Sequence, residues 1–168
     1  SARKVHFRRS FWLLVFGLVH AYLFWLGDIL VLYALCALVV YWFRRLSPRW
    51  LVAGGLLSLA VPAAMVWFAS ATMAYWPPEV YAEMAADGQP DTVVIQEELA
   101  IYRSGWLAQM EARVPQSFES HTYAFIFWGF WRAGGLMLIG MALYKWGVIT
   151  AKRSPRLYAA MLIVGLAA

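Results

Sequence analysis

The feature that most constrains this chain is an apolar run, Ser10–Phe43, that Gly27 and Asp28 interrupt near its middle. Basic residues stand on both sides of the run, which is longer than the roughly 20 apolar residues of one membrane span. We therefore predict a helical hairpin in which Ser10–Leu26 runs outward, Gly27-Asp28 turns and Ile29–Phe43 returns. Because orientation follows the Lys/Arg bias, both open ends are expected on the cytoplasmic side.

The composition is that of an integral membrane protein. Hydrophobic residues make up 63% of the sequence and charged residues 14%, whereas an ordinary soluble domain has about half and a quarter. The net charge is +5, but the basic residues stand in short segments beside apolar runs. That pattern sets topology and is not the basic face of a soluble nucleic-acid-binding domain, so we expect no nucleic-acid partner. The single cysteine, Cys36, excludes a disulfide framework within the chain and is expected to be a buried packing residue.

The two ends of the chain indicate a piece of a longer protein. The sequence begins at Ser1 without an initiator methionine and stops inside an apolar stretch, Tyr158–Ala168, that is too short to cross a bilayer. The first apolar run has no small-residue cleavage site and is followed at once by a returning helix, so we expect no signal peptide.

Further apolar segments complete the predicted bundle. Ser47 is expected to be the N-cap and Pro48 the first residue of the next helix. Trp50–Tyr75 is expected to be a third span that Pro62 kinks and Pro77-Pro78 ends. Tyr123–Trp146 is expected to be a fourth span that runs inward, followed by a fifth that the end of the chain cuts off. The predicted fold class is an all-α membrane protein, a polytopic helical bundle with about four full spans, a truncated fifth and an extracytoplasmic helical loop.

The predicted extracytoplasmic loop, residues 76–121, holds eight of the nine acidic residues and only two of the fourteen basic ones. Within it, Pro78–Ala86 is expected to form a short helix closed by Gly88. Val93–Val114 has one apolar helical face and is expected to lie on the bilayer or cap the bundle until Pro115 stops it. The chain thus divides into residues 1–75 (hairpin and third span), 76–121 (loop) and 122–168 (fourth span and truncated fifth).

Three polar residues, His20, Asp28 and Arg132, are predicted to lie within the membrane. A charged group near the bilayer centre costs roughly 2.5 to 3.5 kcal/mol on insertion scales, so such residues usually face the bundle interior and serve a function. With a rise of about 1.5 Å per residue, His20 and Arg132 are expected at one depth in the outer half of the membrane, with Asp28 above them.

Each of these residues also has a structural interpretation. Asp28 is well placed to cap the returning helix, His20 to form a hydrogen bond between helices, and Arg132 to pair with an acid elsewhere in the protein. His121 is expected to be an interfacial residue. The sequence has no P-loop, zinc-ligand spacing, nucleophile elbow or nucleotide-binding glycine pattern, so we expect no metal and no bound cofactor.

Several motifs occur along the chain: Gly17-Leu-Val-His20, Gly27-Asp-Ile-Leu-Val-Leu-Tyr-Ala34, Arg44-Arg-Leu-Ser-Pro-Arg49, Glu98-x-x-x-Tyr102-x-x-Gly105 and the stretch from Trp131 to Tyr144. Together they resemble motifs of the YeiB-like family of bacterial inner-membrane proteins. The resemblance extends over nearly the whole chain, which is similar to the central part of the longer family members. It implies a multi-pass protein of the bacterial inner membrane with a cytoplasmic start and an extracytoplasmic segment 76–121.

The YeiB-like family is usually placed near the transmembrane acyltransferases, which use an intramembrane histidine. These enzymes move an acyl group from a cytoplasmic thioester donor to an acceptor, often a sugar, on the outer side. The resemblance therefore implies an acyl-CoA-type donor and a sugar-like acceptor. His20 would be the general base, Arg132 would stabilise the oxyanion or hold a donor phosphate, and Asp28 would orient His20 or the acceptor.

Two details of this hypothesis depend on geometry. Asp28 follows His20 by eight residues, too far for contact along an unbroken helix, so a water molecule or a broken turn is needed. Glu98 and Tyr102 would be substrate-binding residues of a lid over the outer mouth.

Two other functions fit the same residues. In a transporter, the buried Arg, His and Asp would form a substrate and proton path. In a non-catalytic membrane subunit, the outer amphipathic helix would be a docking surface. In every case the expected partners include the lipid bilayer and the missing helices of the full-length protein.

Overall fold

The computed structural model describes residues 1–88 and 91–167, which are almost wholly helical and contain no strand, so the all-α class is confirmed. Two segments, η1 and η4, are π-helical, and η2 and η3 are 3-10 turns. In chain order the elements are α1 (Ala2–Val19), η1 (His20–Phe24), α2 (Leu30–Val40), η2 (Tyr41–Arg45), α3 (Pro48–Thr72), η3 (Met73–Tyr75), α4 (Pro78–Gly88), α5 (Thr92–Arg103), α6 (Trp106–Glu119), η4 (Ser120–Gly129), α7 (Phe130–Lys145) and α8 (Pro155–Ala167).

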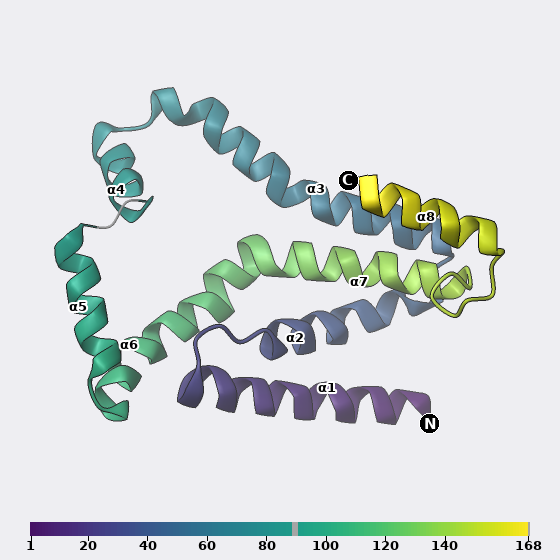
Figure 1. Cartoon of the computed structure of the whole chain (residues 1–168), viewed down its shortest axis with the longest axis horizontal. Helices are drawn as coiled ribbons and strands as arrows, with labels where there is room; N and C mark the ends of the chain where they lie inside the picture. The colour runs from purple at the N-terminus through teal and green to yellow at the C-terminus, as the bar shows by residue number, and fades with distance from the viewer. Residues whose placement is uncertain (89–90, 168) are drawn as a thin grey trace.

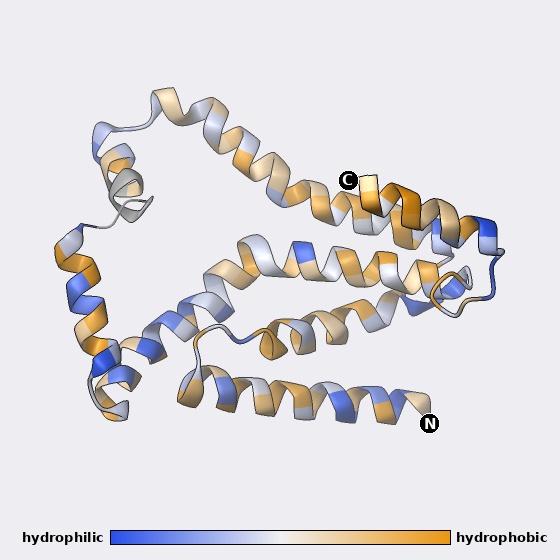
Figure 2. Ribbon diagram, viewed as in Figure 1, coloured by the Kyte–Doolittle hydropathy of each residue, from blue (hydrophilic) through white to orange (hydrophobic). Residues whose placement is uncertain are grey.

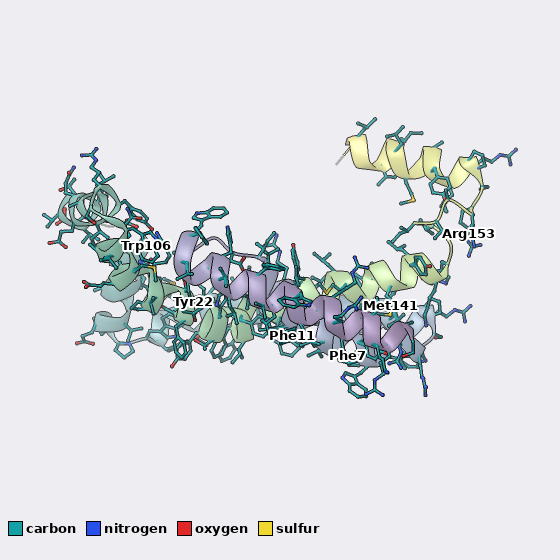
Figure 3. All side chains as sticks on the ribbon, turned by 90° about the horizontal axis from the view of Figure 1, so that it is seen from below. Phe7, Phe11, Tyr22, Trp106, Met141 and Arg153 are labelled. Atoms are coloured by element: carbon teal, nitrogen blue, oxygen red, sulfur yellow. The ribbon has the colours of Figure 1, made fainter. Side chains whose placement is uncertain are left out.

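Four helices form the body of the molecule in the spatial order α1, α2, α7 and α3 (Figure 1). Helix α2 packs between α1 and α7, and α7 packs between α2 and α3. Helices α4 and α5 lie at the end of this bundle away from the N-terminus (Figure 1). Helix α8 overlaps α3 in that view, but the view turned by 90° shows it standing apart from the bundle (Figure 3).

The predicted hairpin is present as α1 and α2, and its turn is longer than the Gly27-Asp28 pair. The chain leaves η1 at Trp25, whose backbone is extended, and becomes helical again at Leu30. The two helices approach closely at Gly17, where an added Cβ would lie 2.7 Å from the backbone nitrogen of Val31. Small residues at such crossings let helix backbones come into contact.

The most extensive helix contact joins α3 to α7, and glycine lines both sides of it. A Cβ added to Gly55 would lie 2.7 Å from the carbonyl oxygen of Gly135, and one added to Gly135 would lie 2.9 Å from that of Gly55. Beside this contact the hydroxyl of Ser58 donates to the carbonyl of Trp131 at 2.7 Å. The two backbones therefore pack directly against each other at this point.

Two helical stretches, Pro48–Tyr75 and Trp106–Lys145, are long and apolar enough to cross a membrane. Only 17% and 22% of their most apolar windows are buried, so packing within the chain does not account for their apolar surface. Orange, apolar residues accordingly recur along both α3 and α7 (Figure 2). These two stretches support an association with the membrane.

The prediction of four full spans is not supported by helix length and composition. Helix α1 carries four basic residues in its first half, and α2 has 11 residues, whereas a span needs about 20 apolar ones. The cause lies in the hairpin turn, because the break from Trp25 to Ile29 removes residues that would otherwise extend both helices.

The segment between the spans differs from its prediction at two positions. The structure divides the expected helix Val93–Val114 into α5 and α6 at Ser104 and Gly105. Ser104 is extended, and its hydroxyl donates to the carbonyl of Ile101 in competition with the helical pattern. Pro115, expected to stop the helix, lies inside α6, which continues through η4 into α7. Contacts of α6 with η1, from the other side of the hairpin turn, support the helix there.

The other boundaries in this region were predicted correctly. Helix α3 begins with Ser47 as its N-cap and Pro48 in its first turn, and with η3 it ends just before Pro77-Pro78. Pro62 lies buried inside α3. The short helix expected for Pro78–Ala86 is observed as α4.

Candidate functional site

His20 and Asp28 meet at the hairpin turn. Nδ1 of His20 lies 3.0 Å from Oδ1 of Asp28. The other carboxylate oxygen of Asp28 accepts the backbone N–H of Val31 at 2.9 Å, which caps the start of α2. One carboxylate therefore makes both contacts, the bond to His20 and the cap of α2. The contact is direct because the helix breaks after η1, so no bridging water is needed.

The two side chains of this pair differ in exposure. The Asp28 side chain is fully buried, whereas 39% of the His20 side chain is exposed. A neutral imidazole that donates its Nδ1–H to a carboxylate keeps Nε2 free to accept a proton. The pair is therefore arranged as an oriented base with one accessible side.

A cavity of about 560 Å³ adjoins the His20–Asp28 pair. Apart from this pair its walls are almost entirely apolar, and the Trp25 ring meets the His20 ring edge-on at 5.9 Å between centroids. A Cβ on Gly27 would lie 2.7 Å from the Trp25 ring, so this glycine makes room for the indole. The cavity suits an alkyl chain beside a proton acceptor. Its lining residues are Phe16, Val19, His20, Phe24, Trp25, Gly27, Asp28, Ile29 and Leu30.

Three side chains of α6 hold the broken turn in place, and we call Trp106, Arg113 and Ser117 the α6 clamp. The indole N–H of Trp106 and a guanidinium N–H of Arg113 both donate to the carbonyl of Leu23, each at 2.9 Å. The hydroxyl of Ser117 donates to the carbonyl of Ala21 at 3.1 Å. The last carbonyl groups of a helix have no hydrogen-bond donor within that helix. The α6 clamp supplies donors for two such carbonyls at the end of η1.

Sequence reasoning did not single out the α6 clamp, although its signal is in the sequence. Arg113 stands in an acidic loop and was counted only as one of its two basic residues, yet it is 8% exposed in the structure. Trp106, Arg113 and Ser117 are spaced by seven and four residues, which places them on one helical face. Figure 3 shows Trp106 and Tyr22 at the same end of the molecule, where α6 meets η1.

The α6 clamp predicts a specific loss of stability. Arg113→Leu should lower the free energy of unfolding by about 1–3 kcal/mol, because the Leu23 carbonyl loses a hydrogen bond from a charged and buried donor. Thermal and denaturant unfolding in detergent measure this change. Arg103→Leu is the matched control, since Arg103 is exposed on α5. Equal stability of the two variants would show that the Arg113 contact contributes nothing.

Arg132 does not join His20 and Asp28. It is exposed on α7 and lines a separate groove of about 630 Å³ with residues of α2, including Tyr33. The cavity of the His20–Asp28 pair is lined by residues of α1, η1, the turn and the start of α2. It shares no lining residue with the Arg132 groove. The proposed centre that combines Arg132 with His20 is therefore not assembled in the described chain.

Glu98 and Tyr102 lie on α5 and do not line the hairpin cavity. They line a pocket of about 310 Å³ between α5 and α6, together with Gln109 and Arg113. Arg113 donates to Oε1 of Gln109 at 3.0 Å as well as to Leu23. Arg113 of the α6 clamp therefore lines this pocket and also contacts η1, the element that carries His20.

His121, which was expected to be an interfacial residue, lies beside Tyr22 of η1. Its ring centroid is 5.8 Å from that of Tyr22, and its Nδ1 is buried without a hydrogen-bond partner. No group of three or more described His, Cys, Asp or Glu side chains is arranged to hold a metal ion.

Comparisons with known proteins give one partial similarity. Residues of this chain are 46% identical over 48 positions to the uncharacterized protein YxaH of Bacillus subtilis (strain 168). The match covers 29% of this chain and 12% of that protein. No family model matches the chain, and no solved structure matches it. The comparisons therefore assign no family and no activity.

Proposed function

We propose that this chain is part of a polytopic bacterial inner-membrane acyltransferase of the YeiB-like family, with His20 as its general base. The observation that supports this proposal is the contact of the exposed His20 imidazole with the buried Asp28 carboxylate, beside an apolar cavity. An oriented base next to a site for an alkyl chain is what acyl transfer from a thioester requires.

The reaction follows from the His20–Asp28 geometry. Asp28 holds the Nδ1–H of His20, so Nε2 removes the proton from an acceptor hydroxyl while its oxygen attacks the thioester carbonyl. A new C–O bond forms, the C–S bond breaks, and the proton taken by His20 passes to the leaving thiolate. General base catalysis of this kind contributes about 10² to 10⁴ in rate. The acyl chain lies along Phe16, Phe24 and Trp25, which line the cavity.

The distribution of charge supports the proposed topology. All basic residues except Arg103, Arg113 and Arg132 lie in three regions. These are the first half of α1, the stretch from the end of α2 to the start of α3, and the stretch from the end of α7 to the start of α8. These three regions lie at the same end of the bundle, where Figure 2 shows blue residues. By the positive-inside rule this end faces the cytoplasm, and α4 to α6 face outward. The short hairpin then crosses the bilayer together with α3 and the α6–α7 helix.

A thiol-release assay tests the proposal. The protein, purified in detergent and returned to lipid vesicles, is mixed with medium-chain and long-chain acyl-CoA and a panel of sugar, glycerol and amine acceptors. We expect free CoA to appear together with an acceptor heavier by one acyl group, and both to be lost in His20→Ala. Release of CoA at the same rate in His20→Ala would refute the catalytic role of His20. Failure to produce any acylated acceptor across the panel would count against acyl transfer itself.

A further inference from the structure

The groove around Arg132 is separate from the site described above. Residues from α2 and from the α6–α7 helix line it, and Arg132 is exposed there. At Gly129 the side chain of Leu32 packs where a Cβ would stand, so the two helices touch at that point. The groove is lined by Leu32, Tyr33, Trp128, Gly129, Arg132, Ala133, Leu136 and Met137.

The guanidinium of Arg132 is in an unfavourable position for a membrane helix. It lies within the candidate span Trp106–Lys145, about 20 Å along the helix from Lys145 at about 1.5 Å per residue. That distance places it inside a hydrocarbon core of about 30 Å. Among the side chains that the structure describes, His20 and Asp28 form the one ion pair, and no hydrogen bond of Arg132 is found. A charge at this depth costs roughly 2.5–3.5 kcal/mol unless an anion compensates for it.

The walls of the groove indicate what accompanies that anion. Leu32, Leu136 and Met137 offer an apolar path, and Tyr33 and Trp128 carry O–H and N–H donors on amphipathic rings. A guanidinium binds carboxylate and phosphate oxygens with two parallel hydrogen bonds. A molecule with an anionic head and an alkyl chain therefore matches both parts of the groove.

The size of the groove favours a small molecule over another helix. Its volume of about 630 Å³ lies within the range of small-molecule sites, about 300–1,000 Å³. Two turns of a helix about 10 Å wide already occupy on the order of 800 Å³. We propose that the Arg132 groove binds an anionic amphiphile, a carboxylate or phosphate ester on an alkyl chain, with its head on Arg132 and its chain along Leu136 and Met137.

Ligand binding to the purified chain in dodecyl maltoside tests the proposal without any enzymatic assay. Dodecanoate and dodecyl phosphate are the charged probes, dodecanol is the uncharged one, and inorganic phosphate lacks the chain. Native mass spectrometry or equilibrium dialysis measures each affinity. We expect the two charged amphiphiles to bind at least tenfold more tightly than dodecanol or inorganic phosphate. Arg132→Gln should remove most of that preference, Arg132→Lys should keep part of it, and Arg103→Gln should leave it unchanged.

Four results would overturn the proposal. Equal binding of dodecanol would mean an apolar groove only, and equal binding of inorganic phosphate would mean a plain phosphate site. Unchanged binding in Arg132→Gln would place the anion elsewhere. Loss of self-association in Arg132→Gln, with no probe bound by the unaltered protein, would mean that an acidic side chain of another copy pairs with Arg132. The groove is separate from the His20–Asp28 cavity, so none of these results bears on acyl transfer.

Discussion

Asp28→Asn is expected to lower the rate of acyl transfer by about three to four orders of magnitude while leaving the hairpin folded. The size of the loss is that known for replacing an aspartate that orients a catalytic histidine. The reason lies in the two contacts of Asp28. The amide oxygen of asparagine accepts the Val31 N–H as before, so its NH₂ group faces Nδ1 of His20. His20 must then accept at Nδ1 and carry its proton on Nε2, where it no longer acts as a base.

Nitrogen NMR of His20 measures this change directly and independently of turnover. In the unaltered protein Nδ1 should be the protonated nitrogen, and in Asp28→Asn it should be Nε2. Asp91→Asn is the matched control, because Asp91 is an exposed N-cap residue at the start of α5 without a side-chain capping bond. A tautomer switch with undiminished acyl transfer would separate the His20–Asp28 contact from catalysis. An unchanged tautomer would contradict the hydrogen-bond assignment itself.

Gly55→Ala is expected to separate α3 from α7 and to lower the free energy of unfolding by about 1–3 kcal/mol or more. The added Cβ would lie 2.6 Å from Cγ1 of Ile139 and 2.7 Å from the carbonyl oxygen of Gly135. Ile139 can rotate, but the Gly135 oxygen belongs to a helix backbone and cannot move alone. The whole α3–α7 contact must therefore open.

The neighbouring glycine supplies the control for this prediction. A Cβ on Gly54 would lie 3.8 Å from Cδ1 of Leu138, an ordinary van der Waals contact. Gly54→Ala should therefore be neutral or stabilising by up to about 1 kcal/mol, the helix preference of alanine over glycine. Unfolding of both variants in the same detergent gives the comparison. If Gly55→Ala proved as stable as Gly54→Ala, α3 and α7 would not pack as closely as their glycines indicate.

The elements that could be predicted from the sequence are those with local signals. Gly27 and Asp28 indicated the hairpin turn, and Ser47 and Pro48 indicated the start of α3. Pro115 was misread because the preference of proline to end a helix is a local rule, and contacts of α6 with η1 outweigh it. The break at Ser104 depends on a hydroxyl that bonds to its own backbone, which residue type alone does not determine.

For the candidate site, the position of a residue along its helix was easier to predict than the helix face on which its side chain lies. Asp28 was expected to orient His20 or the acceptor by way of a water molecule or a broken turn, but the π-helical turn that brings His20 and Asp28 into contact has no sequence signature that we recognised. The α7 helix is apolar on most sides, so periodicity could not show which face carries Arg132. Arg113 was missed because a charged residue in an acidic loop is usually solvated, whereas here it is buried against a backbone carbonyl.

The unbroken helix from Trp106 to Lys145 also determines how a polar molecule reaches His20. Ser117, which bonds to the turn at Ala21, lies at most about 42 Å along this helix from Lys145 at the α-helical rise of about 1.5 Å per residue, because the π-helical η4 within it rises less. A bilayer is about 30 Å thick in its hydrocarbon core and about 40–45 Å with its headgroups. Under the topology proposed above, with Lys145 at the inner surface, the turn falls near the outer edge of the hydrocarbon core, where lipid tails end and water begins. An acceptor dissolved outside the cell would then meet the imidazole at the water's edge, without a tunnel of its own, while a fatty chain reaches the same place from below.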